Sequence, residues 1–304
     1  MLSIDDVRRA LKALGYYDGK VTGAIDSNFR DDLKRFQRDY DLVPDGLYGA
    51  KSDAKLSPLW NTIKAANLPV DSSLRRWRLT YYYIGDQSYH TGTKSIPIYT
   101  PEGKLLSTVE PKAFVEGALE GTTKLRDGRI INVSGGYKTQ SSNTLRPVYD
   151  IAKANGWLPS KAGWAGIKLS GSGNQAVANR CFKEITPGST GYPVWNKIPA
   201  DAFRTLAADI GRLDRHDPKY KGKGGVCPVG TKVFILEYVG VKLPDGTTHD
   251  GWFTVNDTGG GIYGAHYDVF VGSKKLGTTN PPPHLGHVWY TGIDKLSMDY
   301  SYGL

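Results

Sequence analysis

Two aspartates on either side of a glycine-rich stretch are the residues of this chain best suited to acid–base chemistry. Asp257 ends one run of strand-forming residues, and a second run carries His266, Asp268 and Phe270. Residues i and i+2 of a strand share a face, so His266 and Asp268 should point the same way. The glycines between the runs would let the backbone come close to a ligand or to another strand. Spacing alone nevertheless favours a plain hairpin in which Asp257 caps its own turn.

Other candidate sites are weaker. His284 and His287 could bind a metal ion, but no Glu or Cys follows at zinc spacing, so we expect neither a metal nor a cofactor. Cys181 and Cys227 could form one disulfide in an oxidising compartment, although two buried thiols are the favoured expectation. Glu120 is a further carboxylate, which could line a groove or lie exposed in a turn.

The elements that must position these side chains are mostly strands. Runs of β-branched and aromatic residues between turn signals predict four of them, at residues 77–84, 233–241, 252–255 and 267–271. The segment 201–213 is ambiguous between helix and strand. The segment 163–189, rich in Gly, Ser and Lys, has no assignable pattern.

The first 65 or so residues have helical periodicity instead. Ser3, with an acidic residue three positions on, predicts the start of a helix that Gly15 closes. A second helix is expected from Ser27, with apolar residues along one stripe. A third is predicted to start with Ser57 as its N-cap and Pro58 at its first helical position.

Composition narrows the class of protein. The 304 residues include 39 Lys and Arg against 30 Asp and Glu, a net charge of +9, which favours polyanionic partners such as a cell wall. The basic residues are scattered rather than gathered on one stripe, so we expect no nucleic-acid binding. No run approaches the ~20 apolar residues of a membrane span. The first residues lack the features of a signal peptide, so we expect synthesis in the cytoplasm without one.

Three segments of the N-terminal region, at residues 14–19, 36–38 and 44–49, contain two Asp-Gly turns and a Phe-Gln-Arg run between them. In this order they resemble the peptidoglycan-binding domain type 1 family. The resemblance implies a small three-helix module over residues 1–66 that binds the cell wall. A polar, proline-containing linker over residues 67–76 would follow it.

The motif Asp257-Thr258-Gly259-Gly260, followed by Ile262, Gly264 and Asp268-Val269-Phe270, resembles the three-aspartate (3D) domain of the lytic transglycosylase A (MltA-like) family. Upstream, residues 228–233 resemble the Pro-x-Gly-Thr element of that family, and residues 80–82 resemble its Thr-x-Tyr segment. The resemblance implies a multidomain protein, in which residues 77–304 form a mainly-β catalytic domain. That domain would be a double-psi β-barrel with an inserted region and a long groove.

Carried over by position, Asp268 is the expected catalytic acid/base and Asp257 its supporting carboxylate. The third family aspartate is expected at Asp209 rather than Asp217, because Asp209 keeps the preceding alanine. The residues expected to bind substrate are Thr80, Tyr82, Glu120, Thr258, Gly259, Gly260 and His266.

The resemblance implies a peptidoglycan lytic transglycosylase that cuts the MurNAc–GlcNAc β-1,4 bond and leaves a 1,6-anhydro-MurNAc end. Two alternatives stay open: a hydrolytic muramidase, which needs a second carboxylate, and a non-catalytic, expansin-like wall-binding protein. The absent signal peptide and the domain order together resemble phage endolysins, so host cell lysis is expected, with release from the cytoplasm to act on the wall in the periplasm. A bacterial enzyme exported by another route stays open as an alternative. Its partners would be glycan strands, and the protein would act as a monomer.

Overall fold

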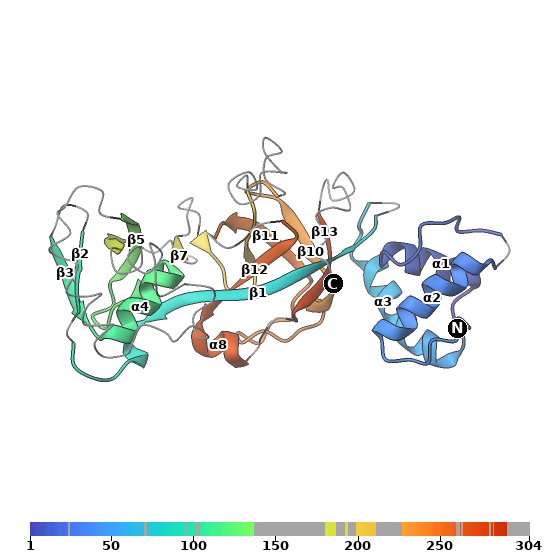
Figure 1. Cartoon of the computed structure of the whole chain (residues 1–304), viewed down its shortest axis with the longest axis horizontal. Helices are drawn as coiled ribbons and strands as arrows, with labels where there is room; N and C mark the ends of the chain where they lie inside the picture. The colour runs from blue at the N-terminus through green and yellow to red at the C-terminus, as the bar shows by residue number, and fades with distance from the viewer. Residues whose placement is uncertain are drawn as a thin grey trace, which may run out of the picture. The chain divides into compact units, whose positions relative to one another are not determined.

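The computed structural model describes residues 1–23, 25–69, 72–94, 96–100, 102, 104–136, 180–186, 192–193, 199–210, 227–259, 262, 264–279, 281 and 283–290. The chain divides into two compact units. The first comprises residues 1–81, 203–270 and 282–304, and the second comprises residues 82–202 and 271–281. The protein is therefore multidomain, with helices at its N-terminus and a mainly-β barrel after them (Figure 1).

The N-terminal helices are α1 (Ile4–Ala13), α2 (Ser27–Asp39) and α3 (Ala50–Ala65). Ser3 caps α1 by accepting a hydrogen bond from the Asp6 backbone N–H, as expected from the sequence, and Gly15 follows the helix with φ +75°. The start of α2 at Ser27 is also confirmed. Buried Leu11, Leu33 and Leu56 bring one residue from each helix into the core.

The expected start of α3 was wrong. The helix begins at Ala50, after Gly49, so Ser57 and Pro58 lie inside it. In the first turn, the Asp53 N–H donates to the Gly49 carbonyl at 2.9 Å, and the Asp53 carboxylate accepts hydrogen bonds from the hydroxyls of Tyr48 and Ser57. These contacts begin the helix before Pro58, which has no N–H to donate within it.

Among the described residues, six strands close into a ring. They are β1 (Arg75–Asp86), β9 (Thr205–Ala207), β10 (Lys232–Ile235), β11 (Trp252–Asp257), β12 (His266–Ser273) and β13 (Leu285–Tyr290). The hydrogen-bonded order is β12-β9-β11-β10-β13-β1, and β12 also pairs with β1. Figure 1 shows β1 (cyan) beside strands from the C-terminal third of the chain (orange to red). The double-psi connection pattern stays a prediction.

Aromatic and β-branched residues fill the barrel. The Trp77 ring stacks on that of Tyr267, with centroids 4.6 Å apart, and Tyr290 meets Trp77 edge-on at 5.4 Å. Val233, Val255, Val269 and Val288 are all fully buried.

Strand boundaries differ from the sequence predictions in three places. β1 begins at Arg75, inside the expected linker. β10 ends at Ile235 and the chain turns into a short 3-10 helix, Leu236–Tyr238, so the predicted strand 233–241 is correct only at its start. The ambiguous segment 201–213 contains strand β9 and, over its described residues 201–210, no helix. Most of the unassigned segment 163–189 lies outside the described residues.

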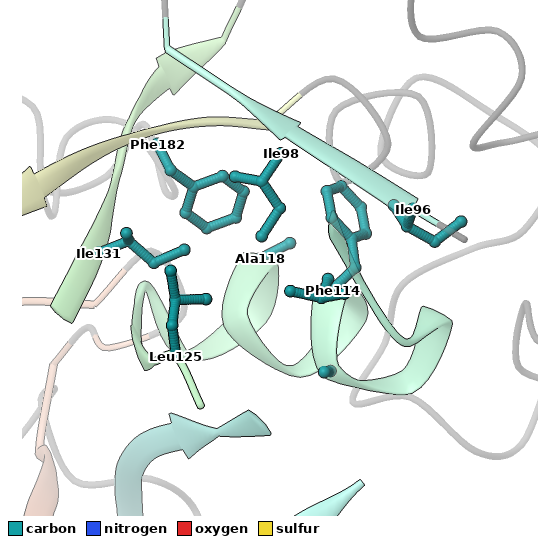
Figure 2. Close-up of a cluster of buried hydrophobic side chains, with 9 residues drawn as sticks. Ile96, Ile98, Phe114, Ala118, Leu125, Ile131 and Phe182 are labelled. Carbon is teal, nitrogen blue, oxygen red and sulfur yellow. The ribbon is translucent and has the colours of Figure 1, made fainter. Parts of the chain in front are cut away.

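The second unit has its own hydrophobic core. It contains the hairpin β2 (Ile96–Tyr99) and β3 (Leu105–Val109), helix α4 (Pro111–Glu120), and the strands β4 (Thr122–Lys124), β5 (Ile130–Gly136) and β6 (Arg180–Ile185). It also contains the two-residue strands β7 (Tyr192–Pro193) and β8 (Pro199–Ala200) and helix α8 (Lys274–Thr279). Figure 2 shows Ile98, Phe114, Leu125 and Phe182 pointing into one buried cluster from the hairpin, α4, the β4–β5 turn and β6.

Candidate active site

Strand β9 sets the spacing of the two motif aspartates, because it lies between the strands that carry them. Ala207 of β9 is the register partner of Asp268 on antiparallel β12 and of Asp257 on parallel β11. The register of β11 shifts at a bulge between Val255 and Asp257, just before this pairing. Asp268 and Asp257 therefore lie on either side of Ala207, about two strand spacings (~10 Å) apart at the backbone, and the charge of Asp257 acts on Asp268.

Asp268 lies in surroundings that favour its protonated form. Burial raises the pKa of Asp268 to about 6, and the charge of Asp257 adds to the rise. Two contacts oppose this: the Thr80 hydroxyl donates a hydrogen bond to Asp268 Oδ1 at 2.7 Å, and the guanidinium of Arg78 lowers the pKa. The net result is a carboxyl group that can hold or release a proton near neutral pH.

His266, two residues before Asp268 on the same strand, also contacts Thr80. Its Nε2 lies 2.7 Å from Thr80 Oγ1. The ring is buried, which lowers the pKa of His266 to about 4, with a smaller contribution from Arg78. His266 is therefore neutral at physiological pH. Its Nδ1 is buried and has no hydrogen-bond partner among the described residues.

Asp257 is partly buried at the end of β11 and shapes the start of the glycine-rich turn. Its Oδ1 accepts a hydrogen bond from the Thr258 backbone N–H at 2.8 Å, and its carbonyl accepts one from Ala208 at 3.1 Å. Asp257 thus caps its own turn, as the hairpin interpretation expected. The plain hairpin was wrong, because β9 lies between β11 and β12. Asp257 and Asp268 are instead both register partners of Ala207 on β9.

Asp209 is buried and acts on the backbone of the turn. Its Oδ2 accepts a hydrogen bond from Gly264 N–H at 3.1 Å, and its carbonyl accepts one from Cys227 N–H at 3.1 Å. Gly264 lies two residues before His266, so Asp209 fixes the entry to β12. Asp217, the alternative third aspartate, lies outside the described residues.

The other predicted substrate-binding residues are placed as follows. Thr258 and Gly259 lie partly buried in the turn, where a Cβ on Gly259 would come within 2.7 Å of the Ile262 side chain. Gly260 lies outside the described residues. Tyr82 and Glu120 belong to the second unit, where Glu120 Oε2 accepts a 3.4 Å hydrogen bond from the Tyr83 backbone N–H. The structure therefore brings together Thr80, His266, Asp257 and Asp268, all in the first unit.

Two residues of this site were missed from the sequence. Arg78 lies two positions before Thr80 on β1, and the alternation of a strand could have placed it on the Thr80 face. No sequence pattern marks Ala207 as a site residue, because its importance comes from its pairing with Asp257 and Asp268.

Two other histidines, His249 and His287, have structural contacts. His249 Nε2 lies 2.6 Å from the Phe203 carbonyl, and His287 Nδ1 lies 2.6 Å from Glu237 Oε1. Cys181 and Cys227 are both buried thiols. Within the described ranges, no group of three or more His, Cys, Asp or Glu side chains could hold a metal ion. In the same ranges, no helix is both long enough and apolar enough to cross a membrane.

Comparison with solved structures finds several lytic transglycosylases. The chain is similar to MltA of Escherichia coli with bound chitohexaose, at 13% identity and a TM-score of 0.43, over 90% of this chain and 91% of that one. It is similar to a membrane-bound lytic murein transglycosylase from Agrobacterium tumefaciens, at 17% identity and a TM-score of 0.41, over 70% and 72% of the two chains. It is also similar to MltA of Neisseria gonorrhoeae, at 13% identity and a TM-score of 0.40, over 71% and 72%.

Comparison with curated protein sequences gives no match. Comparison with family models gives two. The model of the peptidoglycan binding domain matches residues 3–52, and the model of the 3D domain matches residues 224–280, which include Asp257 and Asp268. Both domains expected from the sequence are thus present: the chain carries a peptidoglycan binding domain at its N-terminus and a 3D domain over the strands that hold the paired aspartates.

Proposed function

We propose that this protein is a peptidoglycan lytic transglycosylase that cleaves the β-1,4 bond between MurNAc and GlcNAc and forms 1,6-anhydro-MurNAc. The observation that carries the proposal is the state of Asp268: this aspartate of the 3D domain has its pKa raised to about 6. An acid with that pKa can protonate a leaving group near neutral pH and then act as a base. The peptidoglycan binding domain on the same chain supports the choice of polymer.

In the proposed reaction, the Asp268 carboxyl gives its proton to the glycosidic oxygen as the bond from that oxygen to C1 of MurNAc breaks. Positive charge develops at the sugar ring, where the nearby carboxylates stabilise it. The C6 hydroxyl of the same sugar then attacks C1, and Asp268, now ionised, accepts the hydroxyl proton. No water is consumed, and Asp268 ends the cycle protonated. One carboxyl group suffices because the substrate supplies the nucleophile.

Asp257 supports a second candidate, a hydrolytic muramidase. An inverting glycosidase holds its two carboxyl groups roughly 6.5–9.5 Å apart, so that water fits beside the sugar. Two strand spacings put the Asp257 and Asp268 backbones about 10 Å apart, which is compatible with that arrangement. The two candidates differ in the fate of water, and this can be measured.

The test is mass spectrometry of fragments released from purified peptidoglycan in water enriched in oxygen-18. A transglycosylase releases anhydro ends, one water lighter than reducing ends and without the heavy isotope. Asp268→Asn should remove this release, a loss of roughly 10²–10⁴-fold in rate for general acid catalysis. Asp257→Asn should keep the anhydro product.

Reducing ends that carry oxygen-18 and disappear in Asp257→Asn would establish the muramidase instead. Full release by Asp268→Asn would remove the proposed role of that residue. Retention on peptidoglycan without any release would leave the non-catalytic, wall-binding alternative.

We further propose that the protein serves as an endolysin in host cell lysis and acts on the wall after release from the cytoplasm. The pairing of a wall-binding domain with a 3D domain supports this role, because tethering raises the concentration of glycan strands near the catalytic aspartate. Purified protein added to cells with a permeabilised outer membrane should lyse them. The Asp268→Asn variant should bind the same walls without lysis.

A further inference from the structure

The Thr80 hydroxyl has two close partners, the carboxylate of Asp268 and the ring of His266. Its Oγ1 lies 2.7 Å from Asp268 Oδ1 and 2.7 Å from His266 Nε2. A hydroxyl has a single hydrogen, so it can donate to only one of these partners and must accept from the other. The two hydrogen bonds that link His266, Thr80 and Asp268 can therefore run in only two directions. Either His266 donates to Thr80 and Thr80 donates to Asp268, or both bonds are reversed.

The contacts at the His266 end favour one direction. If Thr80 donates to Asp268 Oδ1, His266 must carry its hydrogen on Nε2 and donate it to Thr80. His266 Nδ1 then carries no hydrogen and is an unused hydrogen-bond acceptor among the described residues. In the other direction Nδ1 would carry the hydrogen, as a buried donor without a partner among the residues the structure describes. Buried N–H groups without partners are rarer in proteins than under-used acceptors, so the hydrogen belongs on Nε2.

This direction has a consequence for Asp268. Oδ1 already accepts the Thr80 hydrogen, whether Asp268 is ionised or protonated. The acid proton must then lie on Oδ2. If both hydrogen bonds were reversed, the acid proton of Asp268 would lie on Oδ1 and point at Thr80, where it could not reach a sugar oxygen.

We propose that Thr80 and His266 are positioning residues that keep the acid proton of Asp268 on Oδ2, so that one oxygen both gives and takes the proton. The proposal rests on the proposed function, and it gives these residues a role other than the sugar contacts expected from the sequence. The hydrogen bonds from His266 to Thr80 and from Thr80 to Asp268 keep their direction through both proton transfers, so neither bond has to reverse during the reaction. Such preorganisation lowers the cost of reaching the transition state.

The charged groups around His266 agree with a role in positioning. His266 stays neutral because its pKa is lowered to about 4, so it does not compete with Asp268 as an acid. The groups that act on Asp268 from the packed strands are Arg78 and Thr80 on β1 and Asp257 on β11. Of these three, Thr80 is the one that donates a hydrogen bond to the Asp268 carboxylate.

The first experiment compares Thr80→Val, which has nearly the same shape but no hydroxyl, with Thr80→Ser, which keeps the hydroxyl. We expect Thr80→Val to lower kcat by about tenfold or more, the effect of losing a hydrogen bond to a charged group. The Thr80 contact lowers the pKa of Asp268, so its removal should also move the alkaline limb of the pH profile to higher pH. Thr80→Ser should restore both properties.

The second experiment compares His266→Gln with His266→Leu. The glutamine amide can donate from a position close to that of Nε2, whereas leucine fills the space without donating. We expect the glutamine variant to keep most of kcat and the leucine variant to lose it, with similar melting temperatures. In the unsubstituted protein, nitrogen NMR of labelled histidine should show the hydrogen of His266 on Nε2.

A wild-type kcat and pH profile in Thr80→Val would overturn the proposal, as would a change confined to KM, which is the mark of a sugar contact. Equal losses of kcat in both His266 variants would mean that His266 only packs against its neighbours. A hydrogen found on Nδ1 would mean that the two hydrogen bonds run in the opposite direction, against the proposal. The product assay separates this inference from the proposed function. If the unsubstituted protein releases anhydro ends and Thr80→Val has no effect, the role of Thr80 and His266 is contradicted and the proposed function is not. If it releases reducing ends, the transglycosylase proposal is contradicted, while the shift of the pH profile in Thr80→Val still tests the role of Thr80.

Discussion

Asp268 is held in a state that suits catalysis and costs stability. Its pKa in the folded protein, about 6, lies above the ordinary aspartate value of 3.8, so folding favours the protonated form. Below pH 4 the group is protonated in both the folded and unfolded states and costs nothing. Between pH 4 and pH 6 the unfolded chain releases the proton more readily, so the free energy of unfolding falls as pH rises.

Asp268→Asn should therefore stabilise the protein at neutral pH. Asparagine is uncharged, so the folded state no longer carries a buried charge. The shift of about two pKa units corresponds to roughly 3 kcal/mol at most. Thermal unfolding should give a higher Tm for Asp268→Asn than for the unsubstituted protein at pH 7.5 and nearly equal values at pH 4. A difference in Tm that is the same at both pH values would mean that the buried charge of Asp268 does not destabilise the folded protein.

The neighbours of Asp268 should shift its titration in opposite directions. The acid must be protonated, so activity should fall as pH rises through about 6. Asp257→Asn removes a charge that raises this pKa, and the alkaline limb should move to lower pH. Arg78→Gln removes a charge that lowers it, and the limb should move to higher pH. Shifts of the same sign in both variants, in profiles of kcat/KM against pH, would contradict this account.

At the scale of single residues, sequence motifs identified much of the site. Asp257 and Asp268 stand at recognisable positions in the 3D motif, and the model of that domain covers both. Their expected catalytic roles stay predictions. The hydrogen bonds of Thr80 could not be foreseen, because Thr80 lies more than 180 residues before His266 and Asp268.

Among the elements, strand β9 matters most for the site although it has only three residues. It separates the two carboxylates, and Ala207 is 3% exposed between its register partners Asp257 and Asp268. Alanine has the smallest side chain that still has a Cβ, so it keeps little side-chain bulk between the two aspartates.

A larger residue at the buried position 207 should disturb the packing between the two aspartates. We expect Ala207→Leu to lower kcat/KM by about tenfold or more, because even small displacements of reacting groups are costly. Ala207→Ser adds one atom and should keep most of the activity. Circular dichroism and Tm would verify that both variants fold. Full activity in a folded Ala207→Leu variant would show that activity does not depend on the packing between the two aspartates.

Elements could be predicted where their signals are local. The caps of α1 and α2 depend on residues within one turn of the helix end, and both helix starts were correct. The start of α3 was wrong because Pro58 is a strong local signal that the contacts of Asp53 override. β9 could not be predicted because its short sequence is a strand only through pairing with residues some 50 to 60 positions later.

For the whole molecule, the net charge of +9 should assist attachment to the anionic wall. Attraction between exposed charges weakens as the Debye length falls from about 10 Å at 0.1 M salt to about 3 Å at 1 M. The fraction of protein that pellets with purified walls should therefore fall as salt rises. Turnover of saturating, short soluble glycan fragments should change little. Retention that does not depend on salt would mean that short-range contacts of the N-terminal domain dominate binding.

The ring of strands also determines when the candidate active site can assemble during synthesis. Two strands of the ring, β12 and β13, follow the other four in the sequence, and β12 pairs with β9 on one side. Domains begin to fold on the ribosome from their N-terminal end, and pairings between distant segments form late. The peptidoglycan binding domain can fold early, but Asp257 and Asp268 can lie on either side of Ala207 only after β12 has emerged. Under the proposed function, a product that ends before β12 should therefore bind peptidoglycan without cutting it.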